Sequence, residues 1–276
     1  MKVTVLGSGA SEGIPALFCN CDSCNKAREA GGKNLRTRSQ FYVEDLMIDL
    51  GDDTYCHTLK EGIALTKLKY LLITHSHIDH YNPTILKYRG GDYATAVYEE
   101  YLNVYSPIAV KEIYDNLERG KPSDDVESKI IFTVPVEFEP FYADSHTIHA
   151  LLANHKKNEK CYIYCVEKDG KRVLFGNDSA FYPEETFDYL RDKHLDLAFL
   201  DCTYGLQTGG LDNSHMDFSV NLQVKEKFYA NKTADDRTIF VSTHFTHICG
   251  SMHEELCQEM DKHGFFASYD GMQLII

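Results

Sequence analysis

Basic residues are scarce in this 276-residue sequence: 28 lysines and arginines stand against 42 acidic residues, which leaves a formal net charge of −14. Such a surface repels polyphosphate and anionic lipid over most of its area, so the composition argues against non-specific binding to nucleic acid or to a membrane surface. A small anionic substrate stays open, because bound divalent cations reverse the local sign of the charge. We therefore expect neither a stable nucleic-acid complex nor a membrane partner.

Long apolar runs are missing as well. No stretch has the length and apolarity of a membrane span, and the opening run, residues 1–7, is too short for the apolar core of a signal peptide. Nine cysteines without a secretory signal indicate reduced thiols or metal ligands and argue against a disulfide framework. Together these features predict a cytoplasmic protein.

Linkers, low-complexity segments and obvious repeats are also absent, which favours a single domain over residues 1–276. Hydrophobic residues make up 43% of the chain, enough for a sizeable core. Apolar strand patterns recur with helices between them, and this alternation predicts an α/β fold built as a layered α/β/β/α sandwich. Residues 92–144 are rich in tyrosine and acid, and we expect them to carry a segment that covers the site.

The closest spacing of possible metal ligands in the chain occurs directly after the apolar run at residues 70–73. This run is typical of a short buried strand. His75, His77, Asp79 and His80 come directly after it. Imidazole nitrogens and carboxylate oxygens bind first-row divalent cations well, and four such groups within six positions exceed what packing needs. An extended backbone directs His75 and His77 to one side, and the turn that follows can bring Asp79 and His80 to a second point nearby. This strand end can therefore hold two metals, as in two-metal hydrolases.

Three further side chains of ligand type follow later strand patterns. His155, Asp178 and His244 each stand at the carboxyl end of an apolar run. Strand ends converge on one edge of a layered fold, where sites form. One such residue alone is more often a cap or a turn residue, but its occurrence together with the first cluster favours a shared metal site.

A cysteine-rich loop occupies about residues 18–25, where Cys19, Cys21 and Cys24 follow a Cys-x-Cys-x-x-Cys spacing. Without a thioredoxin-like context this spacing is a poor redox pair, but it offers three thiolates to a tetrahedral zinc. The fourth ligand has to come from elsewhere, and His247, three residues after His244, is a candidate. The alternative is a loop of free thiols.

With these residues assembled, the chain resembles the metallo-β-lactamase superfamily over nearly its whole length, and His75-x-His77-x-Asp79-His80 is the most specific motif. The resemblance implies a four-layer αββα sandwich with a dinuclear site. It also implies that Asp49 is a supporting aspartate, which orients the ligands without binding a metal. The implied ligands are His75, His77 and His155 for one metal, Asp79, His80 and His244 for the other, and Asp178 as the bridge between them.

Within that superfamily the chain is similar to the cyclic phosphodiesterases of bacterial phosphonate-degradation (C–P lyase) operons. That subgroup has the cysteine loop, a histidine three residues past the last active-site histidine, and an Asn-His-x-Lys element that residues 154–157 match. The similarity implies a structural zinc on Cys19, Cys21, Cys24 and His247. It further implies that His215 contacts the substrate phosphate and protonates the leaving oxygen.

The sequence thus predicts a phosphodiesterase that hydrolyses a small, open or cyclic, phosphodiester with a hydroxide activated by two metals. The catalytic residues would be His215, Asp79 and Asp178, and their metal would be manganese, zinc or iron. Hydrolysis of a thioester, lactone or lactam needs the same seven ligands and stays an alternative. So do a non-catalytic metal-dependent sensor and a tRNA 3′-end type ribonuclease, although the acidic balance argues against the latter. A homodimer is the default oligomer.

Overall fold

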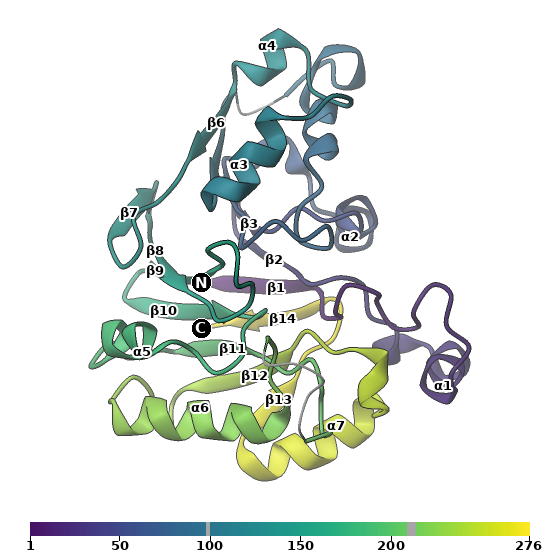
Figure 1. Ribbon diagram of the computed structural model, residues 1–276, viewed down its shortest axis with the longest axis vertical. Helices are drawn as coiled ribbons and strands as arrows, with labels where there is room; N and C mark the ends of the chain where they lie inside the picture. Colours follow the sequence, from purple (N-terminus) through teal and green to yellow (C-terminus); the bar gives the residue numbers. More distant parts are fainter. Residues whose placement is uncertain (98–99, 209–213) are drawn as a thin grey trace.

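The computed structural model describes residues 1–97, 100–208 and 214–276. In these ranges two seven-stranded sheets pack face to face, and helices cover both outer faces (Figure 1). This arrangement confirms the predicted αββα sandwich. None of the helices in the described ranges combines the length and the apolarity needed to cross a membrane.

The first sheet joins the N-terminal strands to the C-terminal one in the order β14-β1-β2-β3-β4-β5-β6. The first three pairs in this order are antiparallel and the last three are parallel. Its strands are β1 (Lys2–Gly7), β2 (Gln40–Val43), β3 (Leu46–Ile48), β4 (Tyr70–Leu72), β5 (Leu102–Tyr105), β6 (Ile130–Thr133) and β14 (Met272–Ile275).

The second sheet repeats this pattern in the order β7-β8-β9-β10-β11-β12-β13, again with three antiparallel pairs followed by three parallel ones. By position in the strand order, β3 therefore corresponds to β10 and β4 to β11. This correspondence between the two sheets is not visible as a repeat in the sequence. The strands are β7 (Pro140–Ala143), β8 (His146–Leu152), β9 (Tyr162–Lys168), β10 (Lys171–Gly176), β11 (Leu197–Asp201), β12 (Ile239–Thr243) and β13 (Phe265–Ala267).

Helices complete the outer layers. Three apolar clusters hold the four layers together: one under the helices of the first half, one between the sheets, and one under the helices of the second half. The α-helices are α1 (Asp22–Ala30), α2 (Thr54–Glu61), α3 (Ile108–Asp115), α4 (Asp124–Glu127), α5 (Glu184–Leu190), α6 (Phe218–Ala230) and α7 (His253–Met260). Short 3₁₀ segments lie between them, among them η3 (Pro83–Arg89) and η5 (His247–Cys249).

Aromatic packing joins the two sheets in one core. The ring of Phe41 on β2 lies 5.1 Å from that of Phe175 on β10 and 4.8 Å from that of Phe199 on β11. All three side chains are fully buried, and each contributes about 1.5–3 kcal/mol of transfer free energy. This contact fixes the distance between the sheets and therefore the distance between the loops at their edges.

Loops from both sheets meet at one edge. The amide of Tyr162 at the start of β9 donates to the carbonyl of Thr74 after β4 at 2.9 Å. The amide of Phe245 after β12 donates to the carbonyl of Ser8 after β1 at 3.0 Å. Residues with metal-binding side chains follow these same strands, so the fold brings them together.

Candidate active site

Three histidines converge after β4 and β8. Nε2 of His75 and Nε2 of His155 lie 2.9 Å and 3.1 Å from Nδ1 of His77. Burial holds the pKa of His75 well below its ordinary value and also lowers the pKa of His77. Neutral imidazoles whose nitrogens face one point form a donor set for a metal cation.

A second group lies beside the first. Oδ2 of Asp79 and Oδ2 of Asp178 each approach Nε2 of His80 at 3.1 Å, and Nε2 of His244 lies 3.2 Å from Oδ1 of Asp178. Nε2 of His80 and of His244 is buried, and despite these short distances it makes no hydrogen bond of acceptable geometry within the described part of the chain. Because a buried polar atom without a partner is costly, a cation bound between these groups would stabilise them.

Asp178 faces both groups. Its Oδ1 is 3.9 Å from Nε2 of His155 in the first group, and its Oδ2 contacts His80 in the second. Burial opposes ionisation of this carboxyl, but the histidines around it, His244 above all, outweigh burial and hold the pKa of Asp178 well below its usual range. The structure thus brings together all seven predicted ligands, with Asp178 in the position expected of the bridge.

Asp49 orients two of the histidines. Its Oδ1 accepts from both the amide and the hydroxyl of Thr74 at 2.9 Å, and its Oδ2 accepts from Nδ1 of His80 at 2.6 Å. Since the Thr74 hydroxyl donates to Asp49, its oxygen accepts from Nδ1 of His75 at 3.0 Å. Both rings therefore direct Nε2 towards the centre, as the predicted supporting role of Asp49 requires.

Asp201 plays the equivalent part in the second half, and it is absent from the predicted site residues. Its Oδ1 accepts from the amide and the hydroxyl of Thr203 at 2.9 Å, and Thr203 Oγ1 in turn accepts from Nδ1 of His244 at 2.9 Å. Its Oδ2 accepts from Nδ1 of His215 at 2.8 Å. The available signal was an aspartate that ends the apolar strand pattern at residues 197–201.

Strained backbone accompanies the site. Asp49, Asp178 and His244 have φ values of 69°, 55° and 67°, a left-handed conformation that costs a non-glycine residue roughly 1–3 kcal/mol. Gly51 permits a close approach nearby, since a Cβ there would lie 2.0 Å from the carbonyl oxygen of Asp79. The fold thus uses conformational energy to aim these side chains at the centre.

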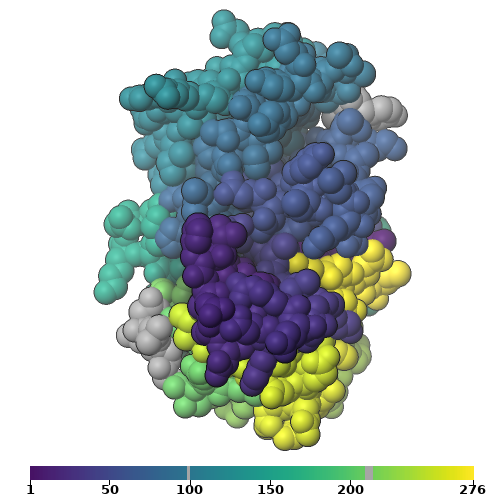
Figure 2. All heavy atoms as spheres, turned by 90° about the vertical axis from the view of Figure 1, so that its right-hand side faces the viewer, coloured from purple at the N-terminus to yellow at the C-terminus, as the bar shows by residue number. Residues whose placement is uncertain are grey.

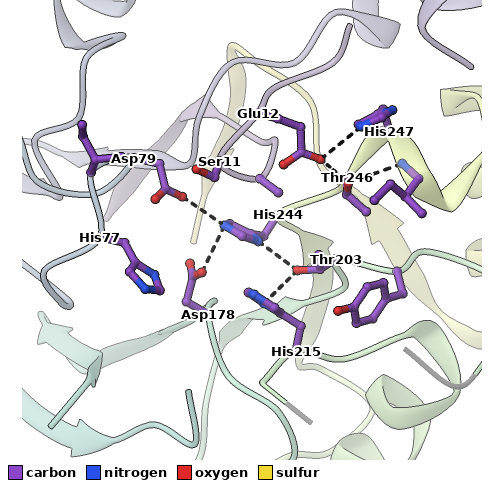
Figure 3. Close-up of a pocket in the computed structure, with 14 residues that line it drawn as sticks. Ser11, Glu12, His77, Asp79, Asp178, Thr203, His215, His244, Thr246 and His247 are labelled. Atoms are coloured by element: carbon purple, nitrogen blue, oxygen red, sulfur yellow. Dashed lines mark hydrogen bonds and ion pairs between the residues drawn. The ribbon is translucent and has the colours of Figure 1, made fainter. Parts of the chain in front are cut away.

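A cavity of about 550 Å³ opens in front of the two groups (Figure 3). His215 forms part of its wall, with its ring 4.8 Å from that of His155 and 5.4 Å from that of His244. In the described residues, the segment at 92–144 expected to cover the site does not line this cavity; it contributes β5, β6, β7, α3 and α4. Residues 98–99 of that segment lie outside the described residues.

Lys156, next to the group of His75, His77 and His155, forms an ion pair. Its Nζ lies 2.9 Å from Oε2 of Glu159 and donates to Oγ of Ser76 at 2.9 Å. Glu159 also accepts from the amide of Ser76 at 3.0 Å. These contacts tie the loop between His75 and His77 to the loop after β8.

The cysteine loop forms a separate group on the face shown in Figure 2, where the N-terminal residues (purple) lie against the C-terminal ones (yellow). Sγ of Cys19 and of Cys21 lie 3.7 Å and 3.4 Å from Nδ1 of His247, and Cys24 completes the cluster. Hydrogen bonds from the Cys24 amide and from His247 lower the pKa of Cys21 to about 6, whereas burial raises the pKa of Cys24 to about 11. Three thiol groups and one imidazole nitrogen are a fitting set for tetrahedral zinc.

Most of the chain matches a known protein family. The family model described as "Beta-lactamase superfamily domain" matches residues 50–244. The octanoyltransferase of Porphyromonas gingivalis is 33% identical over 85 residues, which is 29% of this chain and 16% of that protein. Coenzyme PQQ synthesis protein B of Methylobacterium radiotolerans is 25% identical over 166 residues, which is 54% of this chain and 51% of that protein. The chain thus spans about half or less of the length of these curated relatives.

Solved structures share the whole fold. A diphosphatase of the PhnP family superposes with a TM-score of 0.75 at 20% identity, covering 99% of this chain and 96% of that one. Zn²⁺-bound PqqB from Methylobacterium extorquens gives 0.75 at 16% identity, with both chains covered completely. The short form of human tRNase Z gives 0.63 at 16% identity, covering 100% of this chain and 99% of that one. Identities this low indicate a shared fold and leave the substrate open.

Proposed function

Since the chain belongs to the beta-lactamase superfamily, a family of metal-dependent hydrolases, we propose that it is a dinuclear phosphodiesterase that acts on a small phosphodiester. Bound divalent cations would supply Lewis acidity, which lowers the pKa of a water molecule and stabilises negative charge on the phosphate. Manganese, zinc and iron all suit nitrogen and carboxylate donors. The residues that would hold the two ions are His75, His77, His155, Asp79, His80, His244 and the bridging Asp178.

His215 favours a phosphodiester over a thioester. Its Nδ1 donates to Asp201, so Nε2 is the ring nitrogen on the opposite side, in a residue that lines the cavity. A protonated Nε2 there can donate to an oxygen of the phosphate and then to the departing alkoxide, while the Asp201 carboxylate stabilises the imidazolium. An alkoxide is a poor leaving group that gains most from such a donor, whereas a thiolate leaves without one.

Two further features support phosphorus chemistry. A structural neighbour of nearly the same length is named as a diphosphatase of the PhnP family. The cysteine group would hold a structural zinc on Cys19, Cys21, Cys24 and His247. Hydrolysis of a thioester or lactone does not require such a group. That zinc would fix the loop before α1 against η5 beside the cavity.

Leaving-group dependence tests the role of His215. We expect His215→Ala to slow hydrolysis of an alkyl diester such as glycerophosphocholine by about 10²–10⁴-fold, because an alkoxide needs the proton. A p-nitrophenyl diester, whose phenolate leaves unaided, should lose far less, with unchanged metal content. His263→Ala, on the exposed segment after α7, serves as the matched control. An equal loss on both esters, or no loss with intact metals, would remove His215 from the chemistry.

A substrate panel tests the reaction class. Thioesters, lactones and β-lactams are compared with phosphodiesters at equal concentration on the metal-loaded protein. The proposal requires the highest kcat/KM on a phosphodiester. A thioester or lactone turned over faster than every phosphodiester would contradict it.

A further inference from the structure

Glu12 is an acidic residue in the cavity wall that the chemistry above does not use. It lies in the loop between β1 and α1, and Figure 3 shows it on the side of the cavity formed by Thr246 and His247. A carboxylate in the wall of a site for an anionic substrate is unexpected, because like charges repel most strongly where water is partly excluded.

The loop holds this carboxylate in place. The amide of Ala10 donates to the carbonyl of Phe245 at 2.9 Å, and the amide of Gly13 donates to the carbonyl of Ala10 at 2.9 Å. The hydroxyl of Thr246 donates to Oε1 of Glu12. Glu12 is therefore a fixed part of the wall.

No lysine or arginine is among the described residues that line the cavity, so the positive charge that the wall can offer Glu12 comes from imidazoles such as that of His247. Arg38 donates to the carbonyl of Ser11 at 2.8 Å, but its guanidinium pairs with Asp53 at 3.1 Å. Lys156 pairs with Glu159. The two bound divalent cations would be matched by the two acids of the ligand set, by the hydroxide formed from the bound water and by the phosphate undergoing hydrolysis, which leaves the charge of Glu12 for the rest of the substrate.

We propose that Glu12 makes the site selective for phosphodiesters whose remaining part is neutral or cationic, and that it rejects substrates with a second phosphate. This inference rests on the proposed function and adds the substrate class. A neutral arm with hydroxyl groups can donate hydrogen bonds to the carboxylate, whereas a second phosphate placed in this part of the cavity meets a like charge.

A merely structural role is the rival explanation. Oε1 of Glu12 lies 3.8 Å from Nε2 of His247, so the carboxylate also stands behind a candidate ligand of the cysteine group. A support of this kind would affect zinc retention. It would leave the preference between substrates of different charge unchanged.

Two chromogenic substrates separate these roles. Thymidine 5′-(p-nitrophenyl phosphate) has a neutral sugar arm, and its 3′-phosphorylated form differs only by the second phosphate. We expect the wild-type protein to favour the neutral form in kcat/KM, and Glu12→Gln to shrink that preference by about three- to tenfold, mainly through KM, as befits one unit charge at a partly screened site. Glu226→Gln, the same charge change on the exposed face of α6, should leave the preference unchanged.

A binding measurement and a zinc analysis test the role of Glu12 independently of catalysis. Equilibrium binding of thymidine 5′-monophosphate and 5′-diphosphate by calorimetry, with zinc content measured in the same samples, should show the same relaxation of charge preference in Glu12→Gln. An unchanged preference in both assays, with or without loss of zinc, overturns the inference. If no phosphodiester is hydrolysed, the proposed function fails, and the calorimetric comparison still decides the role of Glu12.

Discussion

Oδ2 of Asp49 lies 2.6 Å from Nδ1 of His80 and accepts its proton, so the opposite ring nitrogen faces the metal centre. The same carboxylate accepts from the amide and the hydroxyl of Thr74, and this threonine orients His75. One side chain outside the predicted ligand set thus sets the direction of two histidines. Its replacement should affect metal affinity before it affects the fold.

We expect Asp49→Asn to weaken metal binding by about ten- to a hundredfold, because an amide cannot accept from all three donors and leaves the histidines less basic. Competition with a chromophoric chelator measures the change. Asp53→Asn, which removes a carboxylate paired with Arg38 outside the cavity, is the matched control. Equal affinity in Asp49→Asn and wild type would contradict the supporting role.

Asp178→Ala should remove at least one metal ion per chain and nearly all activity, since this carboxylate faces both donor groups. The loss should exceed the ten- to hundredfold typical of a residue that only supports a ligand. Elemental analysis and steady-state kinetics measure it, and circular dichroism checks the fold. Asp196→Ala, whose carboxylate pairs with Lys171 just before β11, is the control. Full metal content in Asp178→Ala would show that the ions bind elsewhere.

Cys21→Ser should abolish one zinc per chain that resists removal of the active-site ions. The reason is that Cys21 has the thiol most readily ionised by its surroundings, with a pKa lowered to about 6, and lies 3.4 Å from Nδ1 of His247. Metal analysis before and after chelator treatment tests this, with the exposed Cys56→Ser as control. Zinc content that is the same in Cys21→Ser and Cys56→Ser would refute the assignment.

His253 should make the protein less stable in acid. Its Nδ1 accepts from Arg36 at 3.2 Å, and burial, helped by Arg36 and Lys33, lowers its pKa to about 4. Since the folded-state pKa lies below the ordinary 6.5, the unfolded chain takes up the proton first. The stabilising contribution is complete above about pH 6.5 and is lost as the pH falls towards 4.

Between pH 7.5 and pH 5 this group should account for about 2 kcal/mol of the fall in the free energy of unfolding. His253→Gln should remove that share of the pH dependence, and urea unfolding at the two pH values measures it. His263→Gln on the exposed segment after α7 should behave like wild type. An identical pH dependence in His253→Gln would show that this imidazole does not resist protonation.

The sequence alone was enough to group the seven candidate ligands, and it predicted Asp49, one of the two aspartates that support them. His75, His77, Asp79 and His80 are adjacent in the chain, so local backbone geometry alone suggests a shared centre. The ligands His155, Asp178 and His244 follow apolar strands, and convergence of strand ends at one edge of the fold was enough to group them. The αββα layering followed from the alternation of strands and helices.

The contacts that depend on the order of strands in each sheet could not be predicted from the sequence. Asp201 supports His215 and His244 only because β11 lies between β10 and β12 in a parallel arrangement. Glu12 reaches the cavity because a loop near the N-terminus bonds to Phe245 after β12. Both contacts join residues far apart in the chain, and neither residue has a spacing that sets it apart from an ordinary turn or cap.

The matching strand patterns of the two sheets place Asp49 after β3 and Asp178 after β10, at equivalent points of the two halves. The first half provides four of the donor residues and the second half provides three. An ion held between them would therefore link the two halves, and its binding free energy would also stabilise their packing against each other. Neither half could assemble the centre without the other, so metal uptake would report on the closing of the sandwich itself.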